Sequence, residues 1–129
     1  NVIDTTPVPP ERVITLFDAV DTDLFSPGRE RRNNVRRQFG FDDSLVIVGF
    51  VGRFSQGKGH EELLSAADTI RKKRENVRFL VVGEASYGEE PYERRIRSMA
   101  HAMGLDAVVT FAGFRTDVPA VMSANATMT

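Results

Sequence analysis

The sequence predicts an α/β fold in which a parallel β-sheet is covered by helices on both faces. Short apolar segments and segments of helical periodicity alternate at least three times along the 129 residues. Parallel strands need such helical connections, because the chain must return to the same end of the sheet. Three apolar segments also end directly in a glycine, and the carboxyl ends of parallel strands form the edge at which α/β proteins bind ligands.

The first predicted elements lie on either side of a turn-rich connector. Residues 12–17 (RVITLF) are a short apolar run rich in β-branched side chains, which favours a strand, and 18–28 are a connector of short polar residues. Residues 29–40 have a helical pattern that ends at Gly40, where a left-handed backbone costs glycine little. Residues 44–51 are continuously apolar, as expected for a strand buried on both faces.

Further strands and helices complete the predicted sheet. Apolar residues spaced three and four apart predict amphipathic helices, and apolar runs predict the strands between them. Gly104 is expected to close the longer of the later helices. In chain order the elements are a helix over 61–73, a strand over 77–82, a helix over 92–103, a strand over 107–112, a short helix over 117–123 and the beginning of a further element over 126–129.

Composition and charge exclude several classes of function. Seventeen basic and 18 acidic residues give a formal net charge of -1, so no overall field attracts nucleic acid or an anionic membrane. The chain has no Cys, and His60 and His101 lie far apart in sequence, which makes a metal site unexpected. No apolar run approaches the roughly 20 residues of a membrane span. We therefore expect a cytoplasmic protein without metal or nucleic acid, in which any anion site is local.

The spacing G-x-x-x-x-G-K over 52–58 is that of a phosphate-binding P-loop. However, Gly59 stands where the ATPase pattern requires Ser or Thr to hold magnesium, and Gly83 stands where the Asp of a second strand would be. An ATP-hydrolysing P-loop is therefore not expected. What remains is a helix start, whose free N–H groups attract anions, flanked by Arg53 and Lys58. The alternative that these two cations are solvated loop residues stays open.

Four segments of the chain carry a family resemblance. In chain order they are RVITLFDAVDTDLFSP (12–27), GFVGRFSQGKGHEELLSAA (49–67), RFLVVGEA (78–85) and LDAVVTFAGFRTDVPAVMSANATMT (105–129). They resemble the hinge, the donor-side loop, a strand end and the stretch around the next short helix in the glycosyltransferase group 1 family, retaining enzymes with two Rossmann-like domains in the GT-B arrangement. Asp18 departs from the Asn that is usual in the hinge. The resemblance covers residues 11–129.

The resemblance implies a fold and a division of the chain. The sheet would be a Rossmann-like parallel sheet, one half of a GT-B fold, truncated. Residues 1–20 would be the hinge and the final strand of a preceding acceptor domain. Residues 21–129 would be a nucleotide-sugar donor-binding domain, incomplete at its C-terminus because the family's downstream pair of glutamates is not reached. No complete set of catalytic residues is therefore expected.

The resemblance also implies roles for single residues at the diphosphate of the donor. Arg53 and Lys58 would hold the diphosphate, Gly52 would let it approach the chain, and Gly59 would begin the helix that faces it. Gly57 departs from the Glu that commonly precedes Lys-Gly in the family, so Lys58 is expected to be less firmly oriented.

On the other side of the predicted site, Phe114 and Arg115 would lie against the base, partly through backbone groups, and Glu84 beside the sugar. Alternatives stay open for most of these residues: Phe114 buried under the strand edge, Glu84 without a role in binding, and Asp117 as a helix cap only. His60 is expected to be a surface residue.

The function implied is transfer of a sugar from a UDP-, GDP- or ADP-linked donor to an acceptor. The acceptor, a sugar, a lipid or a small molecule, would bind through the missing domain, with no metal and no other cofactor. The parent protein would be cytoplasmic, and this is compatible with association to the cytoplasmic side of a membrane. The fragment alone would be inactive. The alternatives are another GT-B nucleotide-sugar enzyme such as an epimerase or phosphorylase, a phosphotransfer receiver module, and a non-catalytic α/β nucleotide-binding or interaction module.

Overall fold

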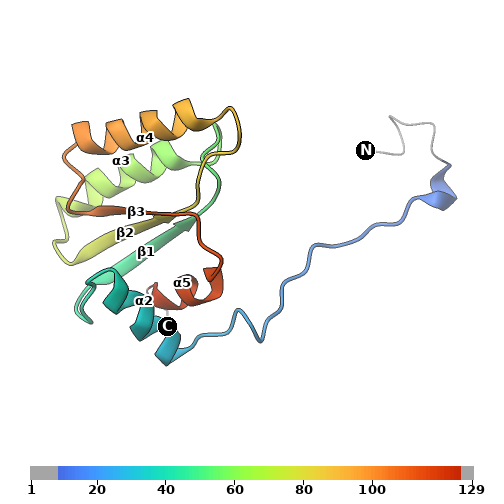
Figure 1. Cartoon of the computed structure of the whole chain (residues 1–129), viewed down its shortest axis with the longest axis horizontal. Helices are drawn as coiled ribbons and strands as arrows, with labels where there is room; N and C mark the ends of the chain where they lie inside the picture. The colour runs from blue at the N-terminus through green and yellow to red at the C-terminus, as the bar shows by residue number, and fades with distance from the viewer. Residues whose placement is uncertain (1–8, 126–129) are drawn as a thin grey trace.

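The computed structural model describes residues 9–125. An extended N-terminal arm leads into an α/β domain (Figure 1). Its helices and strands agree with the predicted ones from residue 29 onward to within two residues at each end. The element expected over 126–129 lies outside the described residues. In chain order the elements are η1 (Pro10–Arg12), α2 (Arg29–Gln38), β1 (Val46–Val51), α3 (His60–Arg71), β2 (Val77–Val82), α4 (Glu90–Ala102), β3 (Val109–Gly113) and α5 (Val118–Ala124).

The three strands form a parallel sheet in the order β1-β2-β3. Val46 lies opposite Val77 in the first pair of strands, and Phe79 opposite Val109 in the second. The crossover helices α3 and α4 cover one face of the sheet, and α2 and α5 cover the other (Figure 1). This arrangement confirms the predicted parallel sheet with helices on both faces.

Each face of the sheet has its own buried cluster of apolar side chains. On β2, Phe79 and Val81 point to the cluster that includes Leu64 of α3 and Ile96 of α4. Leu80 and Val82 alternate with them and join a second cluster on the other face; its further members are Phe41, Ile47 and Val121. Because β2 is buried on both sides, its sequence is apolar at nearly every position, which is why periodicity of two is absent from it.

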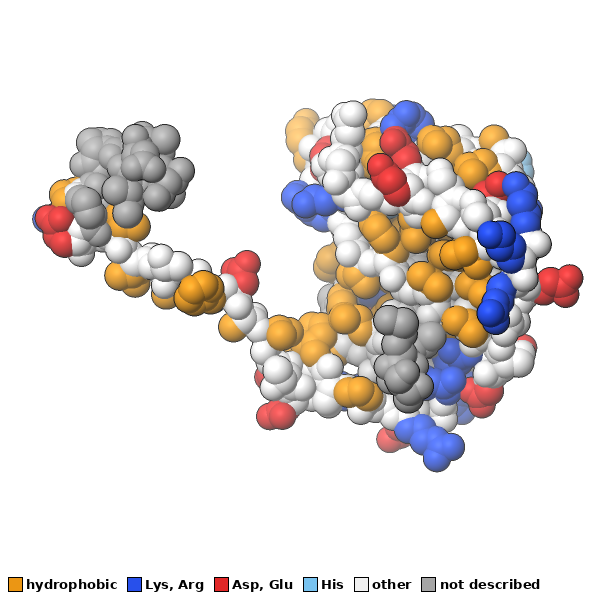
Figure 2. All heavy atoms as spheres, turned by 180° about the vertical axis from the view of Figure 1, so that it is seen from behind, with side chains coloured by type: hydrophobic (Ala, Val, Ile, Leu, Met, Phe, Trp, Pro, Cys, Tyr) orange, Lys and Arg blue, Asp and Glu red, His pale blue; other side chains and the backbone are white. Residues whose placement is uncertain are grey.

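The arm before the domain differs from the prediction. Residues 13–20 form no strand, although 12–17 had favoured one, and they make no backbone hydrogen bond to the rest of the described chain. Their apolar side chains are exposed along the arm, as Figure 2 shows, with Phe17 at 89% exposure. A β-branched run becomes a strand only beside a partner that satisfies its N–H and C=O groups, and residues 9–125 supply none.

The connector that follows the arm is a turn, as predicted. The carboxylate of Asp21 accepts hydrogen bonds from the N–H groups of Asp23 and Leu24, both at 3.0 Å. Arg31 of α2 then donates to the carbonyl oxygens of Leu24 at 2.7 Å and Ser26 at 2.8 Å. These contacts join the connector to the first helix of the domain.

Candidate functional site

The carboxyl ends of the three strands surround a hollow of about 510 Å³. The walls come from the segments that follow β1, β2 and β3, so residues from three separate stretches of the sequence meet there. The predicted site residues that line it are Gly52, Arg53, Glu84, Phe114 and Arg115. Lys58 and Gly59 lie outside its walls, in the loop that leads from β1 to α3.

Gly83 allows the strand ends to approach each other this closely. Its N–H donates to the carbonyl of Gly113 at 2.9 Å, and the N–H of Gly52 donates to Val82 at 2.9 Å. Gly83 has φ of 140°, and a Cβ at this position would lie 1.9 Å from the carbonyl oxygen of Gly52. The residue is therefore required by the contact between two strand ends, a reason that depends on the register of the sheet.

The loop between β1 and α3 exposes a set of backbone donors. Gly59 precedes the helix with φ of 89°, a left-handed conformation that favours glycine, and it offers no side-chain cap. Among the described residues, the N–H groups of His60, Glu61 and Glu62 have no hydrogen-bond partner. Such free N–H groups, together with the helix dipole, attract anions. The exposed side chain of Lys58 stands immediately before them.

The same loop is tied to the loop that follows β2. The N–H of Phe54 donates to the carbonyl of Glu84 at 3.1 Å, and the hydroxyl of Ser55 donates to Glu89 at 2.5 Å. Arg53 donates to the hydroxyl of Ser86 at 3.0 Å. Because the contact of Arg53 is to a neutral hydroxyl, its full positive charge remains available to an anion in the hollow.

Glu93 on α4 supports the loop that follows β2. Burial raises its pKa, but hydrogen bonds from Arg97 and from the N–H of Ala85, the latter at 2.8 Å, outweigh this effect and the pKa is lowered. The carboxylate is therefore ionised at neutral pH and holds the start of the loop after β2.

His60 is buried, so the expectation of a surface residue is wrong. Its ring is 1% exposed and stacks on Phe54 with 4.4 Å between ring centroids. The reason is helical phase: His60, Leu64 and Ala67 follow the i, i+4, i+7 spacing of one face, and all three face the sheet. This spacing in the sequence could have identified His60 as a buried residue.

At the end of β3, Phe114 is 65% exposed, so its burial under the strand edge is excluded. The guanidinium of Arg115 is engaged elsewhere: it makes two hydrogen bonds to the carboxylate of Asp117, at 2.8 and 2.7 Å, and a third to Gln38 at 3.0 Å. It also lies 5.4 Å from the ring centroid of Phe39. The Arg115 side chain thus braces the loop after β3 against the end of α2.

The ion pair changes the titration of both partners. The hydrogen bond from Arg115 lowers the pKa of Asp117, and the same bond raises the pKa of Arg115. Asp117 stands at the N-cap position of α5, yet its side chain makes no capping hydrogen bond. The interpretation of Asp117 as a cap is therefore replaced by a role as the partner of Arg115.

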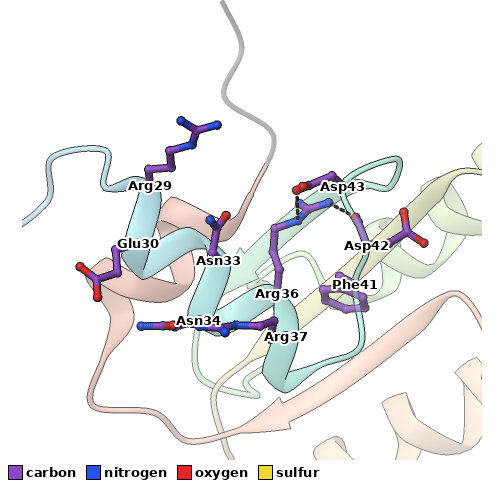
Figure 3. Close-up of a pocket in the computed structure, with 9 residues that line it drawn as sticks. All are labelled: Arg29, Glu30, Asn33, Asn34, Arg36, Arg37, Phe41, Asp42 and Asp43. Carbon is purple, nitrogen blue, oxygen red and sulfur yellow. Dashed lines mark hydrogen bonds and ion pairs between the residues drawn. The ribbon is translucent and has the colours of Figure 1, made fainter.

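A second hollow, of about 710 Å³, lies beside α2 and the loop before β1 (Figure 3). Its buried cation, Arg36, donates to the carbonyl oxygens of Asp42, Leu45 and Ala124 at 2.5, 2.6 and 3.0 Å. The other side chains around it do not converge, since Arg29 and Glu30 point in different directions (Figure 3). We regard this hollow as part of the scaffold, in which Arg36 joins α5 to the segment before β1.

Across residues 9–125, no group of three or more His, Cys, Asp or Glu side chains could hold a metal ion. Within the same range, none of the helices has the length and apolar character needed to cross a membrane.

Comparison with known proteins identifies relatives over most of the chain. The sequence model of the family described as Glycosyl transferases group 1 matches residues 31–128. The D-inositol 3-phosphate glycosyltransferase of Segniliparus rotundus is 35% identical over 101 residues, 78% of this chain and 22% of that protein. The GDP-mannose-dependent alpha-(1-6)-phosphatidylinositol monomannoside mannosyltransferase of Mycobacterium tuberculosis is 30% identical over 94 residues, 73% of this chain and 23% of that protein.

Among solved structures, Anabaena HepE in complex with UDP-glucose has a TM-score of 0.76 at 27% identity, and the match covers 92% of this chain and 32% of that one. The chain thus spans about a quarter of the length of the curated relatives that it matches. With a family match over 31–128 and the parallel sheet of a GT-B domain, the chain belongs to the glycosyltransferase group 1 family.

Proposed function

We propose that this chain is the donor-binding part of an enzyme that transfers a sugar from a nucleotide-sugar to an acceptor. The observation that carries the proposal is the hollow at the carboxyl edge of the sheet, which joins an available cation, Arg53, to an exposed aromatic ring, Phe114. The similarity to HepE, whose structure is described in complex with UDP-glucose, supports a nucleotide-sugar as the ligand. Under this proposal, residues 1–20 would be the hinge with the final strand of the acceptor domain, and residues 21–129 the donor-binding domain.

The diphosphate of the donor would lie between the end of β1 and the start of α3. Arg53 supplies a planar fork for phosphate oxygens, and Lys58 a mobile charge from the other side. The free N–H groups at the start of α3 complete the site. In the reaction, these groups would stabilise the negative charge that develops on the departing diphosphate. A metal ion has this role in other transferases. No metal is required in this mechanism, and retention of configuration at the sugar is part of the proposal.

The base would lie against the exposed ring of Phe114. The side chain of Arg115 is turned toward Asp117, so its contribution to the base would come from its backbone groups. Glu84 is exposed in the wall of the hollow and is the candidate for contact with the sugar.

The affinity of the isolated chain can be bounded from these contacts. Two charge-assisted hydrogen bonds contribute about 1.5–3 kcal/mol each, and a base stacked on Phe114 adds about 1–3 kcal/mol, against an association cost of at least about 4 kcal/mol. The net free energy is at best about 5 kcal/mol, so binding in the millimolar range or weaker is expected, and the chain alone is not expected to catalyse transfer.

The test is a titration of the isotope-labelled chain with UDP, GDP and ADP, each with and without magnesium, followed by backbone amide shifts. The expected result is a set of shifts at 52–59 and 113–115 that do not depend on magnesium and are strongest for one base. The Lys58→Ala variant should lose most of the response, whereas Lys73→Ala, which removes an exposed lysine just beyond the other end of α3, should respond as wild type. Shifts confined to other regions, or shifts that need magnesium, would contradict the proposal.

A further inference from the structure

His60 occupies an aromatic cage, formed by Phe50, Phe54 and Tyr92, directly beside the proposed diphosphate site. Phe54 stacks on the His60 ring, with an angle of 25° between the ring planes. Phe50 and Tyr92 meet it edge to face, with centroid distances of 4.7 and 5.9 Å. Both ring nitrogens are buried, and neither has a hydrogen-bond partner among the described residues.

The cage suits the neutral ring and not the imidazolium. A neutral imidazole has one N–H to place, and an edge-to-face contact lets that N–H approach the face of an aromatic ring. The imidazolium has two N–H donors and a full charge, for which the cage offers no acceptor. Burial accordingly lowers the pKa of His60.

Charged groups of both signs lie around the cage, and the carboxylates among them partly oppose the lowering of the His60 pKa by burial. The carboxylates of Glu61, Glu62 and Glu93 act to raise the pKa of His60, but burial outweighs them. Arg95, which is paired with Glu61, lies over Tyr92 at 5.4 Å, and Arg97 lies over Phe54 at 5.8 Å. The two arginines add positive charge on the α4 side of the cage, and Lys58 adds a third cation two residues earlier in the chain.

The stacked pair of rings joins the two ends of the β1–α3 loop. Phe54 directly follows Arg53, and His60 directly follows the Lys58–Gly59 pair. Each cation of the proposed site is therefore attached to one of two rings that lie 4.4 Å apart. The free N–H groups at the start of α3 include that of His60 itself. The stacked rings therefore connect the two backbone segments that carry Arg53 and Lys58.

We propose that His60 is a positioning residue whose neutral ring, stacked on Phe54, holds Arg53 and Lys58 at the spacing that the donor diphosphate requires. Protonation of the ring opens the stack, loosens the loop and weakens nucleotide-sugar binding. This inference rests on the proposed function, since it assigns the diphosphate to this loop.

The first test needs no nucleotide. The His60 and His101 ring signals and the backbone amides of 53–60 are recorded in the labelled 129-residue chain from pH 7.5 down to a pH at which the His60 ring is protonated, because burial lowers the pKa of this ring. In wild type, the loop amides should shift with the midpoint of the His60 ring. In His60→Phe, which keeps an aromatic ring in the cage but cannot be protonated, they should stay constant. His101→Gln removes the exposed histidine, which pairs with Asp106, and should behave as wild type.

The second test measures affinity for UDP-glucose at the same two pH values. Its diphosphate is esterified at both ends and so lacks the terminal phosphate proton that titrates near pH 6. Wild type and His101→Gln should bind about tenfold more weakly at the lower pH, where His60 is protonated, the change expected for loss of one charge-assisted contact. His60→Phe should bind equally at both pH values.

Three results would overturn the positioning role: loop amides that ignore the titration of the His60 ring, loop amides that titrate equally in His60→Phe, or a wild-type affinity that is the same at both pH values. If UDP-glucose shifts no amide of the wild-type chain at any pH, the proposed function fails instead. The amide titration of the free chain then still decides whether His60 positions the loop.

Discussion

The two sides of the hollow at the sheet edge differ in how their cations are held. On the side proposed for the diphosphate, the side chain of Arg53 donates only to a hydroxyl, and Lys58 has no ion-pair partner among the described residues. On the side proposed for the base, Arg115 is fixed by Asp117, Gln38 and the ring of Phe39. A cation without a carboxylate partner can bind an anionic ligand, whereas a cation in a two-point ion pair positions the backbone around it. The difference is consistent with the proposed binding of the diphosphate by Arg53 and Lys58, and with a supporting role for the Arg115 side chain.

The largest expected effect on stability comes from a substitution at Gly83, where the ends of the strands on both sides of the hollow meet. Gly83→Ala places a methyl group against the carbonyl oxygen of Gly52 and also strains a backbone with φ of 140°. We expect the free energy of unfolding to fall by about 3 kcal/mol or more, measured by urea denaturation. Gly88→Ala is the matched control: it has φ of 86° but no atom near the new methyl group, and should cost about 1 kcal/mol. Equal losses in the two variants would argue against the close approach.

The next change breaks only the diphosphate side. Lys58→Ala should weaken nucleotide binding by the worth of one charge-assisted contact, about 1.5–3 kcal/mol, and leave stability unchanged because the side chain is exposed. The measurement is nucleotide affinity from amide shifts, with the urea midpoint recorded on the same sample. A stability loss equal to the binding loss would show that Lys58 supports the fold and does not contact the ligand.

A smaller change breaks only the base side. Arg115→Ala should lower the free energy of unfolding by about 1 kcal/mol, because the ion pair is only partly shielded from water. Diphosphate affinity should change much less than in Lys58→Ala. Arg115→Lys should recover little of the stability, since lysine cannot reproduce the two-point contact. If Arg115→Ala abolished nucleotide binding and left the free energy of unfolding unchanged, the supporting role of Arg115 would be contradicted.

The smallest expected effect is the dependence of stability on pH through the ion pair of Arg115 and Asp117. The Arg115 hydrogen bond lowers the pKa of Asp117 below its ordinary value of 3.8. The stabilisation is therefore fully present above about pH 3.8 and is lost as pH falls through the lower folded value, because the unfolded chain then binds the proton more readily. Urea midpoints between pH 5 and pH 2.5 should fall less steeply in Asp117→Asn than in wild type. Parallel curves would show that the pair does not stabilise the native state.

Much of the fold follows from the local sequence. The strand over 77–82 and the helix over 29–38 are set by apolar runs, helical spacing and a terminal glycine, all of which act over a few residues. The meeting of Gly52, Arg53 and Phe114 at one edge follows as well, since parallel strands place their carboxyl ends together.

What sequence reasoning missed depends on contacts between distant segments. The run 12–17 has the composition of a strand but lacks a partner in the described chain. The need for glycine at position 83 arises from the carbonyl of Gly52, which only the register of β1 and β2 reveals. The resemblance placed Arg115 against the base, whereas its side chain is held by Asp117 and by the distant Gln38, a contact that only the packing of α2 reveals. His60 is the exception: its burial was predictable from the spacing to Leu64, and its hydrophilic character masked that signal.

The central claim is that the edge of the sheet binds a nucleotide diphosphate without a metal ion. Its most direct test is the structure of this chain with bound UDP in the absence of magnesium. We predict phosphate oxygens about 3 Å from the first N–H groups of α3 and from the side chains of Arg53 and Lys58, with the base against Phe114. A diphosphate bound elsewhere, for example in the hollow beside α2, or one that appears only when magnesium is added, would contradict the account.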